Sequence, residues 1–170
     1  MSLSAVFLDA GPLSEIVRRP GQNPQADACR AWVLSLVSAG VLVCVADVTD
    51  YEVRRELLRA GKTSSVRRLD ALENSIVEYV PLTTNTLRES ATLWALARNT
   101  GQSTAPPAAL DADVILCSAV KLFTMVQGIS LSSAIVATTN VAHIGRFVAA
   151  DLWSNIANLS ESENDHGREH

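Results

Sequence analysis

The sequence predicts an α/β domain with a mostly parallel central sheet. Short apolar runs alternate along the chain with longer segments in which apolar residues recur at helical spacing. The apolar runs contain few polar residues, which is typical of parallel strands that helices cover on both faces. We expect strands over residues 4–9, 41–47, 76–82 and 133–139.

The first two helices have recognisable ends. A helix is expected to begin at Gly11-Pro12, because proline is favoured at the first helical position. A second helix is expected over residues 25–39, where apolar residues recur at helical spacing until Gly40 ends the pattern. Residues 18–24, between the two helices, have the composition of a loop.

Four further helices are expected, over residues 49–60, 62–74, 84–99 and 111–126. The last of these is apolar almost all round, which predicts a central helix that its neighbours cover. The segment before it, residues 100–109, is expected to be a loop. A short helix and an ordered segment are expected after the last strand.

The size and composition of the chain fit one domain. It has 170 residues, of which 48% are hydrophobic, with a mean hydropathy of +0.17, so it can bury a substantial core. We assign residues 1–157 to a single domain. Residues 158–170 are polar and have little to bury, so we expect a disordered tail.

Composition also excludes several classes of protein. A net charge of -4 argues against a protein that coats nucleic acid without specificity. The three cysteines lie in apolar contexts without CxxC spacing, so we expect reduced, buried thiols. No apolar run is long enough to span a membrane, and no signal peptide is recognisable, so we expect a cytoplasmic protein.

Several acids and amides follow the predicted strands. Asp9 ends the first strand, Glu52 lies in the first turn of the helix after the second strand, and Asp113 lies in the first turn of the central helix. Thr138, Thr139 and Asn140 close the last strand. Because ligands bind beyond the carboxyl ends of the strands in open α/β sheets, these residues are expected to converge on one site.

Each of these residues also has a structural explanation. Asp9 could form an Asx-turn, Thr49 and Glu52 could form a capping box, Asp111 could be an N-cap, Asp113 could interact with a helix dipole, and Asn140 could cap the last helix. Structural caps would be scattered over both edges of the sheet. The predicted topology instead brings these residues to one edge, which favours a functional site.

Converging carboxylates favour a divalent cation. They repel one another unless a positive charge lies between them, and Mg²⁺ and Mn²⁺ prefer oxygen ligands. No histidine cluster indicates zinc, since His143 is alone near the site. A carboxylate-bound Mg²⁺ can lower the pKa of water and neutralise charge on a phosphoryl group. This chemistry indicates phosphodiester hydrolysis.

The segment YEVRRELLRAGKTSSVRR follows the second strand and is strongly basic. Most of its cations are explained as a solvated helix face, with pairs such as Glu52 with Arg55. One or two of them could still contact phosphates, and Arg54 and Arg55 are the candidates nearest the acids.

Four stretches together resemble the PIN-domain proteins, in particular the VapC-like toxins of type II toxin–antitoxin pairs. The stretches are VFLDAGPL, VTDYEVRRELL, LDADVILCSAV and IVATTNVAHIGRF, and they occur in the order of the family. The resemblance implies a three-layer α/β/α sandwich and a metal-dependent endoribonuclease that hydrolyses RNA. It also implies a small antitoxin protein as partner and a homodimer.

The resemblance carries over to individual residues. Asp9, Glu52 and Asp113 match the acids that hold Mg²⁺ or Mn²⁺ in the family, and Asn140 matches a fourth catalytic position that is acidic in many members. The neutral amide leaves one charge fewer for metal binding. Ala10 replaces a common Ser or Thr, so one hydroxyl is missing. Thr139, with Arg54 and Arg55, is then a candidate substrate contact.

One other function remains open, and two are disfavoured by missing residues. A degenerate PIN domain could bind RNA or a partner protein without catalysis, and Ala10 and Asn140 favour this alternative. A phosphatase of the haloacid-dehalogenase type needs a second acid two residues after Asp9, where this chain has Gly11. A phospho-acceptor domain that resembles response regulators needs a lysine after the last strand, and ATTNVAHIG contains none.

Overall fold

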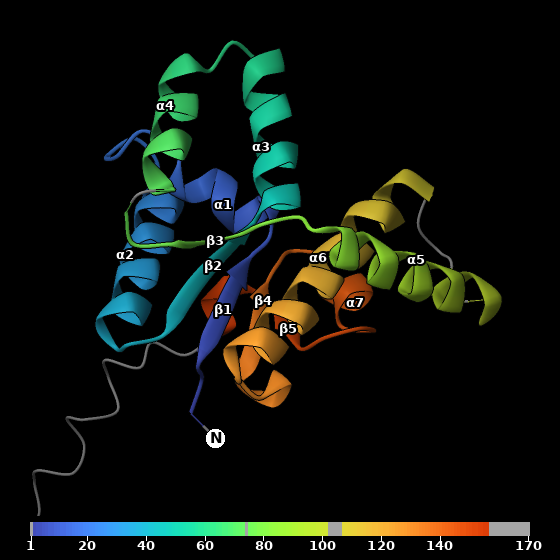
Figure 1. The fold of residues 1–170 in the computed structure, drawn as a ribbon. Helices are drawn as coiled ribbons and strands as arrows, with labels where there is room; N and C mark the ends of the chain where they lie inside the picture. Colours follow the sequence, from blue (N-terminus) through green and yellow to red (C-terminus); the bar gives the residue numbers. More distant parts are fainter. Residues whose placement is uncertain (1, 74, 102–106, 157–170) are drawn as a thin grey trace, which may run out of the picture.

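The computed structural model describes residues 2–73, 75–101 and 107–156, which form alternating strands and helices (Figure 1). The strands are β1 (Ala5–Leu8), β2 (Leu42–Ala46), β3 (Glu78–Val80), β4 (Ala134–Ala137) and β5 (Ala150–Asp151). The helices are α1 (Ala10–Ile16), α2 (Pro24–Ser38), α3 (Asp47–Arg59), α4 (Thr63–Leu72), α5 (Thr84–Asn99), α6 (Pro107–Gln127) and α7 (Val141–Ile144), with 3₁₀ turns η1 (Leu131–Ser133) and η2 (Trp153–Asn155). The predicted tail, 158–170, lies outside the described residues.

The five strands form one sheet in the order β3-β2-β1-β4-β5, and all neighbouring strands pair in parallel. The predicted parallel sheet is therefore confirmed. Each of the four predicted strands is shorter in the structure than in the prediction. The short strand β5 has no periodic pattern that could have been recognised in the sequence. The chain builds the sheet first on one side of β1 and then on the other, so the boundary between β1 and β4 is a topological switch point.

Helices cover both faces of the sheet, as the predicted α/β/α sandwich requires. Val6 and Leu8 of β1 pack into a core with α1 and α2, whereas Ala5 and Phe7 face the other core, with α5 and α6. This alternation follows from the two-residue period of a strand. In the second core the rings of Phe7 and Phe123 pack edge to face, with their centres 5.7 Å apart.

Two predicted helix starts are wrong by a few residues. Helix α1 begins at Ala10, with Asp9 as its N-cap, so Pro12 is the third residue of the helix and not the first. Helix α3 begins at Asp47 directly after β2, so Thr49 is not an N-cap and the predicted capping box is absent. The Thr49 side chain is instead fully buried. Because β2 ends at Ala46 and α3 begins at Asp47, no turn residues lie between them to mark the boundary in the sequence.

Helix α6 also begins earlier than predicted, at Pro107, so Asp111 lies inside the helix and cannot be its N-cap. The prediction of a central helix is confirmed, because α6 packs against α5 and also contacts α3 and α7. The three cysteines are buried free thiols, as expected. No helix within the described residues is long and apolar enough to cross a membrane.

A partly buried ion pair fixes α3 between α4 and the sheet. Arg54 donates from Nε and Nη2 to the two carboxylate oxygens of Asp50, at 2.7 and 3.2 Å, and from Nη1 to Asp70 of α4, at 2.6 Å. The Tyr79 hydroxyl on β3 donates to the Asp50 carboxylate at 2.8 Å. The Asp50 carboxylate therefore links α3 to the edge strand, and the Arg54 guanidinium that it binds links α3 to α4.

The Asp50→Ala substitution should reduce the free energy of unfolding by about 2–3 kcal/mol, because it leaves the Arg54 guanidinium and the Tyr79 hydroxyl without their acceptor. Asp70→Ala is the matched control, since the Asp70 side chain is 56% exposed, against 10% for Asp50. That control should cost less than about 1 kcal/mol. Urea unfolding followed by circular dichroism measures both values, and equal losses in the two variants would contradict this assignment.

Candidate active site at the carboxyl edge of the sheet

Asp9 lies at the switch point of the sheet. Its backbone N–H donates to the Ala137 carbonyl of β4 at 3.0 Å, which holds the end of β1 against β4. One side-chain oxygen, Oδ1, accepts from the Ala10 N–H at 2.8 Å, and the other, Oδ2, accepts from the Thr138 hydroxyl at 2.6 Å. Asp9 is therefore an N-cap and a site residue at once, and its carboxylate is fixed in orientation.

Asn140 connects the end of β4 to the central helix. The Asn140 backbone N–H donates to the Thr138 hydroxyl oxygen at 2.8 Å, and its side-chain Nδ2 donates to Asp113 Oδ2 at 3.1 Å. Although Asn140 is the N-cap residue of α7, its side chain makes no capping hydrogen bond. A chain of hydrogen bonds thus runs from Asp9 through Thr138 and Asn140 to Asp113.

Thr138, which the sequence placed at this edge of the sheet without a role in the site, is a link in this chain. Its side chain is fully buried, and its hydroxyl donates to Asp9 while accepting from Asn140. The available signal was a hydroxyl directly after an apolar strand, beside the predicted Thr139. Thr139 itself is exposed and lies against Gly11, where an added Cβ would approach the Thr139 methyl to 3.3 Å.

The third carboxylate, Glu52, comes from α3. Its side chain is 24% exposed, and the nearest cation, Arg55, lies 3.9 Å from its Oε1. Burial raises the pKa of Glu52, the Asp9 carboxylate raises it further, and Arg55 lowers it. Glu52 therefore lies within the electrostatic field of Asp9, as the sequence predicted for these two acids.

Asp113 has the most perturbed carboxyl group of the three. Burial, followed by the negative charges of Asp9 and Glu52, raises the pKa of Asp113 to about 7. The amide of Asn140 hydrogen-bonds to this carboxyl without adding a charge. The three acids, at the end of β1 and on α3 and α6, thus interact electrostatically, and Arg55, which lowers the pKa of Glu52, offsets only part of their combined charge.

The side chains at this site suit a hard divalent cation such as Mg²⁺. They offer carboxylate and amide oxygens, which such cations prefer, and a bound cation would relieve the repulsion among the carboxylates. The three side chains do not already form a closed coordination sphere: within the described residues, no group of three or more His, Cys, Asp and Glu side chains is close enough to hold a metal ion. Cation binding would therefore require side-chain rotation, for which Glu52 has the fewest restraints.

The two predicted arginines differ in their surroundings. Arg54 is held by Asp50 and Asp70, on the side of α3 that faces α4. Arg55 is exposed, lies over the Tyr51 ring with its guanidinium carbon 5.3 Å from the ring centre, and is the arginine that affects Glu52. Of the two, Arg55 is the exposed arginine beside the acids.

The Asp113→Asn substitution should stabilise the metal-free protein above about pH 7. Folded Asp113 keeps its proton to about pH 7, whereas the unfolded chain releases it near its ordinary pKa, so the Asp113 contribution to stability falls as the pH rises through this window. The amide does not ionise and can still accept from Asn140. The gain in free energy of unfolding in EDTA should be about 1–2 kcal/mol at about pH 8, after allowance for solvent screening, and should vanish at acidic pH.

Chemical denaturation across the pH range measures this difference. Asp111→Asn, an exposed acid on the same helix, is the control for loss of one negative charge. The same pH dependence of stability in wild type and Asp113→Asn would show that burial and repulsion do not act on Asp113.

Comparisons with known proteins place the fold. No family model and no curated protein matches the chain in sequence. Among solved structures, a chain of VapBC2 from Rickettsia felis bound to a DNA fragment from their promoter aligns with a TM-score of 0.63 and 11% identity, covering 88% of this chain and 98% of that one.

Two further structures agree. DNA-bound VapBC from Salmonella typhimurium aligns with a TM-score of 0.57 and 15% identity, over 89% of this chain and 99% of that one. VapBC-1 from nontypeable Haemophilus influenzae aligns with a TM-score of 0.56 and 12% identity, over 88% and 98%. The chain therefore has the PIN-like α/β/α fold found in these VapBC structures, as the resemblance of its four stretches predicted.

Proposed function

We propose that the protein is a metal-dependent endoribonuclease that uses Mg²⁺ or Mn²⁺ to hydrolyse RNA phosphodiester bonds. The observation that carries this proposal is the interaction of Asp9, Glu52 and Asp113 beyond the carboxyl ends of β1 and β4, with the pKa values of two of the acids raised. Ligands of open α/β sheets bind at the switch point, and clustered carboxylates there favour a cation. A bound cation would in turn attract a phosphoryl group.

Asp9, Glu52 and Asp113 are the residues that would hold the cation. When bound, it would neutralise charge on the phosphoryl group and lower the pKa of the attacking water. The protein's own contribution is orientation: Ala10 and Thr138 fix Asp9, and Asn140 fixes Asp113. In this proposal Thr139 and Arg55, both exposed, contact the substrate strand.

The similarity of fold to VapBC complexes supports a place in a toxin–antitoxin pair. In this proposal the chain is the toxin, it forms a homodimer, and a small antitoxin protein binds it and covers the acidic site. RNA as the substrate follows from the resemblance of the four motifs to VapC-like ribonucleases. A short reading frame directly upstream of the gene would support the antitoxin.

The Asp9→Asn substitution should reduce metal-dependent RNA cleavage by at least about 100-fold, because it removes one charge from the cation site while Thr138 and Ala10 can still bind the side chain. The assay compares Mg²⁺, Mn²⁺ and EDTA on structured and unstructured RNA, with DNA of the same sequence as a second substrate. Glu73→Gln, an exposed acid on the α4 side, is the matched control and should cleave normally. Full activity of Asp9→Asn would refute the assignment.

The affinity for Mn²⁺ should increase as the pH rises from about 6 to about 8, by up to roughly tenfold per pH unit below the pKa of Asp113. The reason is that the cation competes with the proton that Asp113 holds to about pH 7 in the metal-free protein. Isothermal titration calorimetry at several pH values measures the affinity, and protons released on binding give a second signal. An affinity that does not change with pH would contradict a role for Asp113 as a ligand.

A degenerate PIN domain that binds RNA or a partner without catalysis is the second candidate. The specific observation in its favour is that Asn140 supplies an amide, and not a carboxylate, to Asp113. Ala10 also provides no hydroxyl beside Asp9. Binding of Mn²⁺ without turnover on any RNA would select this candidate, and Asn140→Asp combined with Ala10→Ser is then the variant that should restore cleavage.

A further inference from the structure

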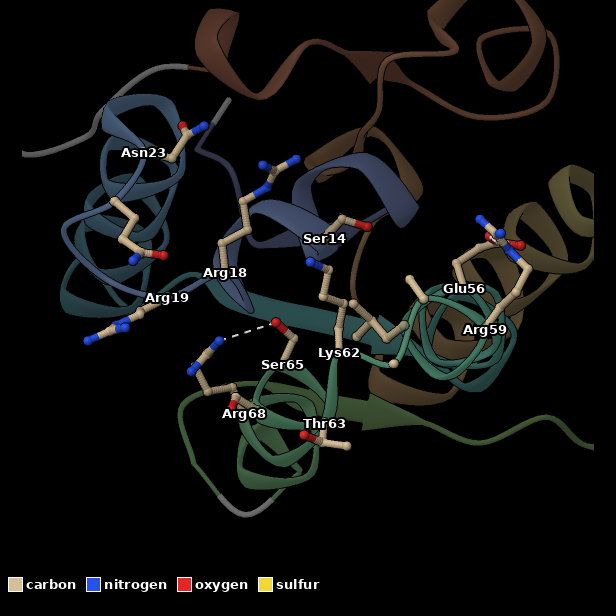
Figure 2. A pocket seen from close by; sticks show the side chains of 15 residues that line it. Ser14, Arg18, Arg19, Asn23, Glu56, Arg59, Lys62, Thr63, Ser65 and Arg68 are labelled. Atoms are coloured by element: carbon tan, nitrogen blue, oxygen red, sulfur yellow. Dashed lines mark hydrogen bonds and ion pairs between the residues drawn. The ribbon is translucent and has the colours of Figure 1, made fainter.

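A pocket of about 730 Å³ lies between the α1–α2 connection and the α3–α4 turn (Figure 2). Its lining is strongly basic: it contains five of the chain's 14 Lys and Arg residues, but only one of the 18 Asp and Glu residues. The cations are Arg18, Arg19, Arg59, Lys62 and Arg68, and the acid is Glu56. A chain with a net charge of -4 thus concentrates positive charge in one hollow.

Two of these cations are positioned by the backbone. Gly61, with a φ of 65°, allows a left-handed turn in which the Lys62 N–H donates to Leu57 O at 2.8 Å and the Gly61 N–H donates to Leu58 O at 3.1 Å. Arg68 donates from Nε to the Val17 carbonyl at 2.7 Å and from Nη2 to Ser65 Oγ at 3.2 Å. Arg68 therefore holds the two sides of the pocket together and is preorganised.

The remaining charges leave the pocket positive. Glu56 pairs with Arg59 at 2.8 Å, and the two lie together on one side of the hollow, whereas Arg18, Arg19, Lys62 and Arg68 lie around the rest of it (Figure 2). Arg18 pairs with Glu15 at 3.3 Å but is 53% exposed. Within the described residues, Arg19 and Lys62 make no ion pair.

The pocket and the acidic site share helices α1 and α3. Glu56, in its lining, lies one helical turn after Glu52 on the same face of α3, and Ser14 follows Asp9 by five residues along α1. Helices α1 and α3 contact each other, so a strand that places one phosphate at the acids can continue along these helices into the basic pocket.

We propose that this pocket binds a backbone phosphate of the RNA strand that flanks the scissile bond. The inference rests on the proposed ribonuclease function and adds the second point at which the substrate strand is held. The first turn of α4, residues 63–65, contributes hydroxyl groups and the positive end of its helix dipole to the same hollow.

The lining favours a phosphate backbone over an acidic peptide. Apart from Leu57, the lining has no large apolar side chain, so it lacks the apolar anchor that usually carries the binding energy of a peptide or protein partner. It offers guanidinium, ammonium, hydroxyl and amide donors, which are the groups that bind phosphate oxygens. Such contacts carry no base specificity.

The test measures RNA binding in EDTA, so it does not depend on cleavage. A short fluorescent oligouridylate is titrated with the wild type and with Arg19→Gln/Lys62→Gln, which leaves the structural contacts of Arg68 intact. The dissociation constant of the double variant should rise roughly tenfold at low salt. A plot of the logarithm of the association constant against the logarithm of the salt concentration should become less steep, by about 0.7 for each phosphate group that the variant no longer neutralises. Arg88→Gln, on the exposed surface of α5, is the matched control and should bind like the wild type.

Three results would overturn the proposal. The first is unchanged affinity and salt slope in the double variant, and the second is no binding of RNA by the wild type. The third is a polyglutamate peptide that binds the wild type, loses affinity in the double variant and does not compete with RNA, which would assign the pocket to an acidic protein segment. Asp9→Asn should retain RNA binding, so loss of cleavage in that variant and loss of binding in the pocket variant report separately on the two proposals.

Discussion

The repulsion among Asp9, Glu52 and Asp113 is the constraint on which the rest of the site depends. Each carboxylate is delivered by a different element, β1, α3 or α6, and burial adds to the cost of their charges. Such an arrangement destabilises a protein unless a proton or a cation neutralises it. The folded chain takes up a proton at Asp113 near neutral pH, and in our proposal a divalent cation replaces that proton.

The fold holds the elements that carry the three acids in place despite the repulsion among their carboxylates. Two apolar layers cover the parallel sheet, and the Asp50–Arg54 pair anchors α3 to α4 and to β3. At the switch point, buried Thr138 and the Asn140 amide bind two of the three carboxylates. Hydrogen bonds to a carboxylate favour its charged form, so they oppose the repulsion directly. Glu52, which has no comparable restraint, is the ligand best able to move.

The sequence was sufficient to predict the class of fold and the edge of the sheet that holds the acids. Apolar runs and helical periodicity indicated the parallel sheet, and the position of Asp9 after β1 located the site. The boundary at Thr49 was missed because β2 enters α3 without a turn, and Pro107 was placed in a loop because its neighbours along the chain are turn formers. Local patterns cannot show where a strand leaves the sheet, since tertiary packing sets that point.

Side-chain partners were harder to predict than positions. Arg54 and Arg55 are adjacent in sequence and were treated alike, yet one is bound by two aspartates and the other is exposed beside Glu52. Thr138 and Thr139 differ in the same way, one buried in the hydrogen-bond chain and the other on the surface. The basic pocket combines residues from two connections far apart in sequence, which only the folded chain brings together.

The central claim is that the three carboxylates share one cation. A titration with Mn²⁺ followed by electron paramagnetic resonance tests it directly, because bound and free Mn²⁺ give different signals. The account predicts one ion per chain in the wild type, with binding weakened in each of Asp9→Asn, Glu52→Gln and Asp113→Asn, and retained in Asp111→Asn. Binding that survives all three substitutions, or that is lost equally in the control, would contradict a shared site.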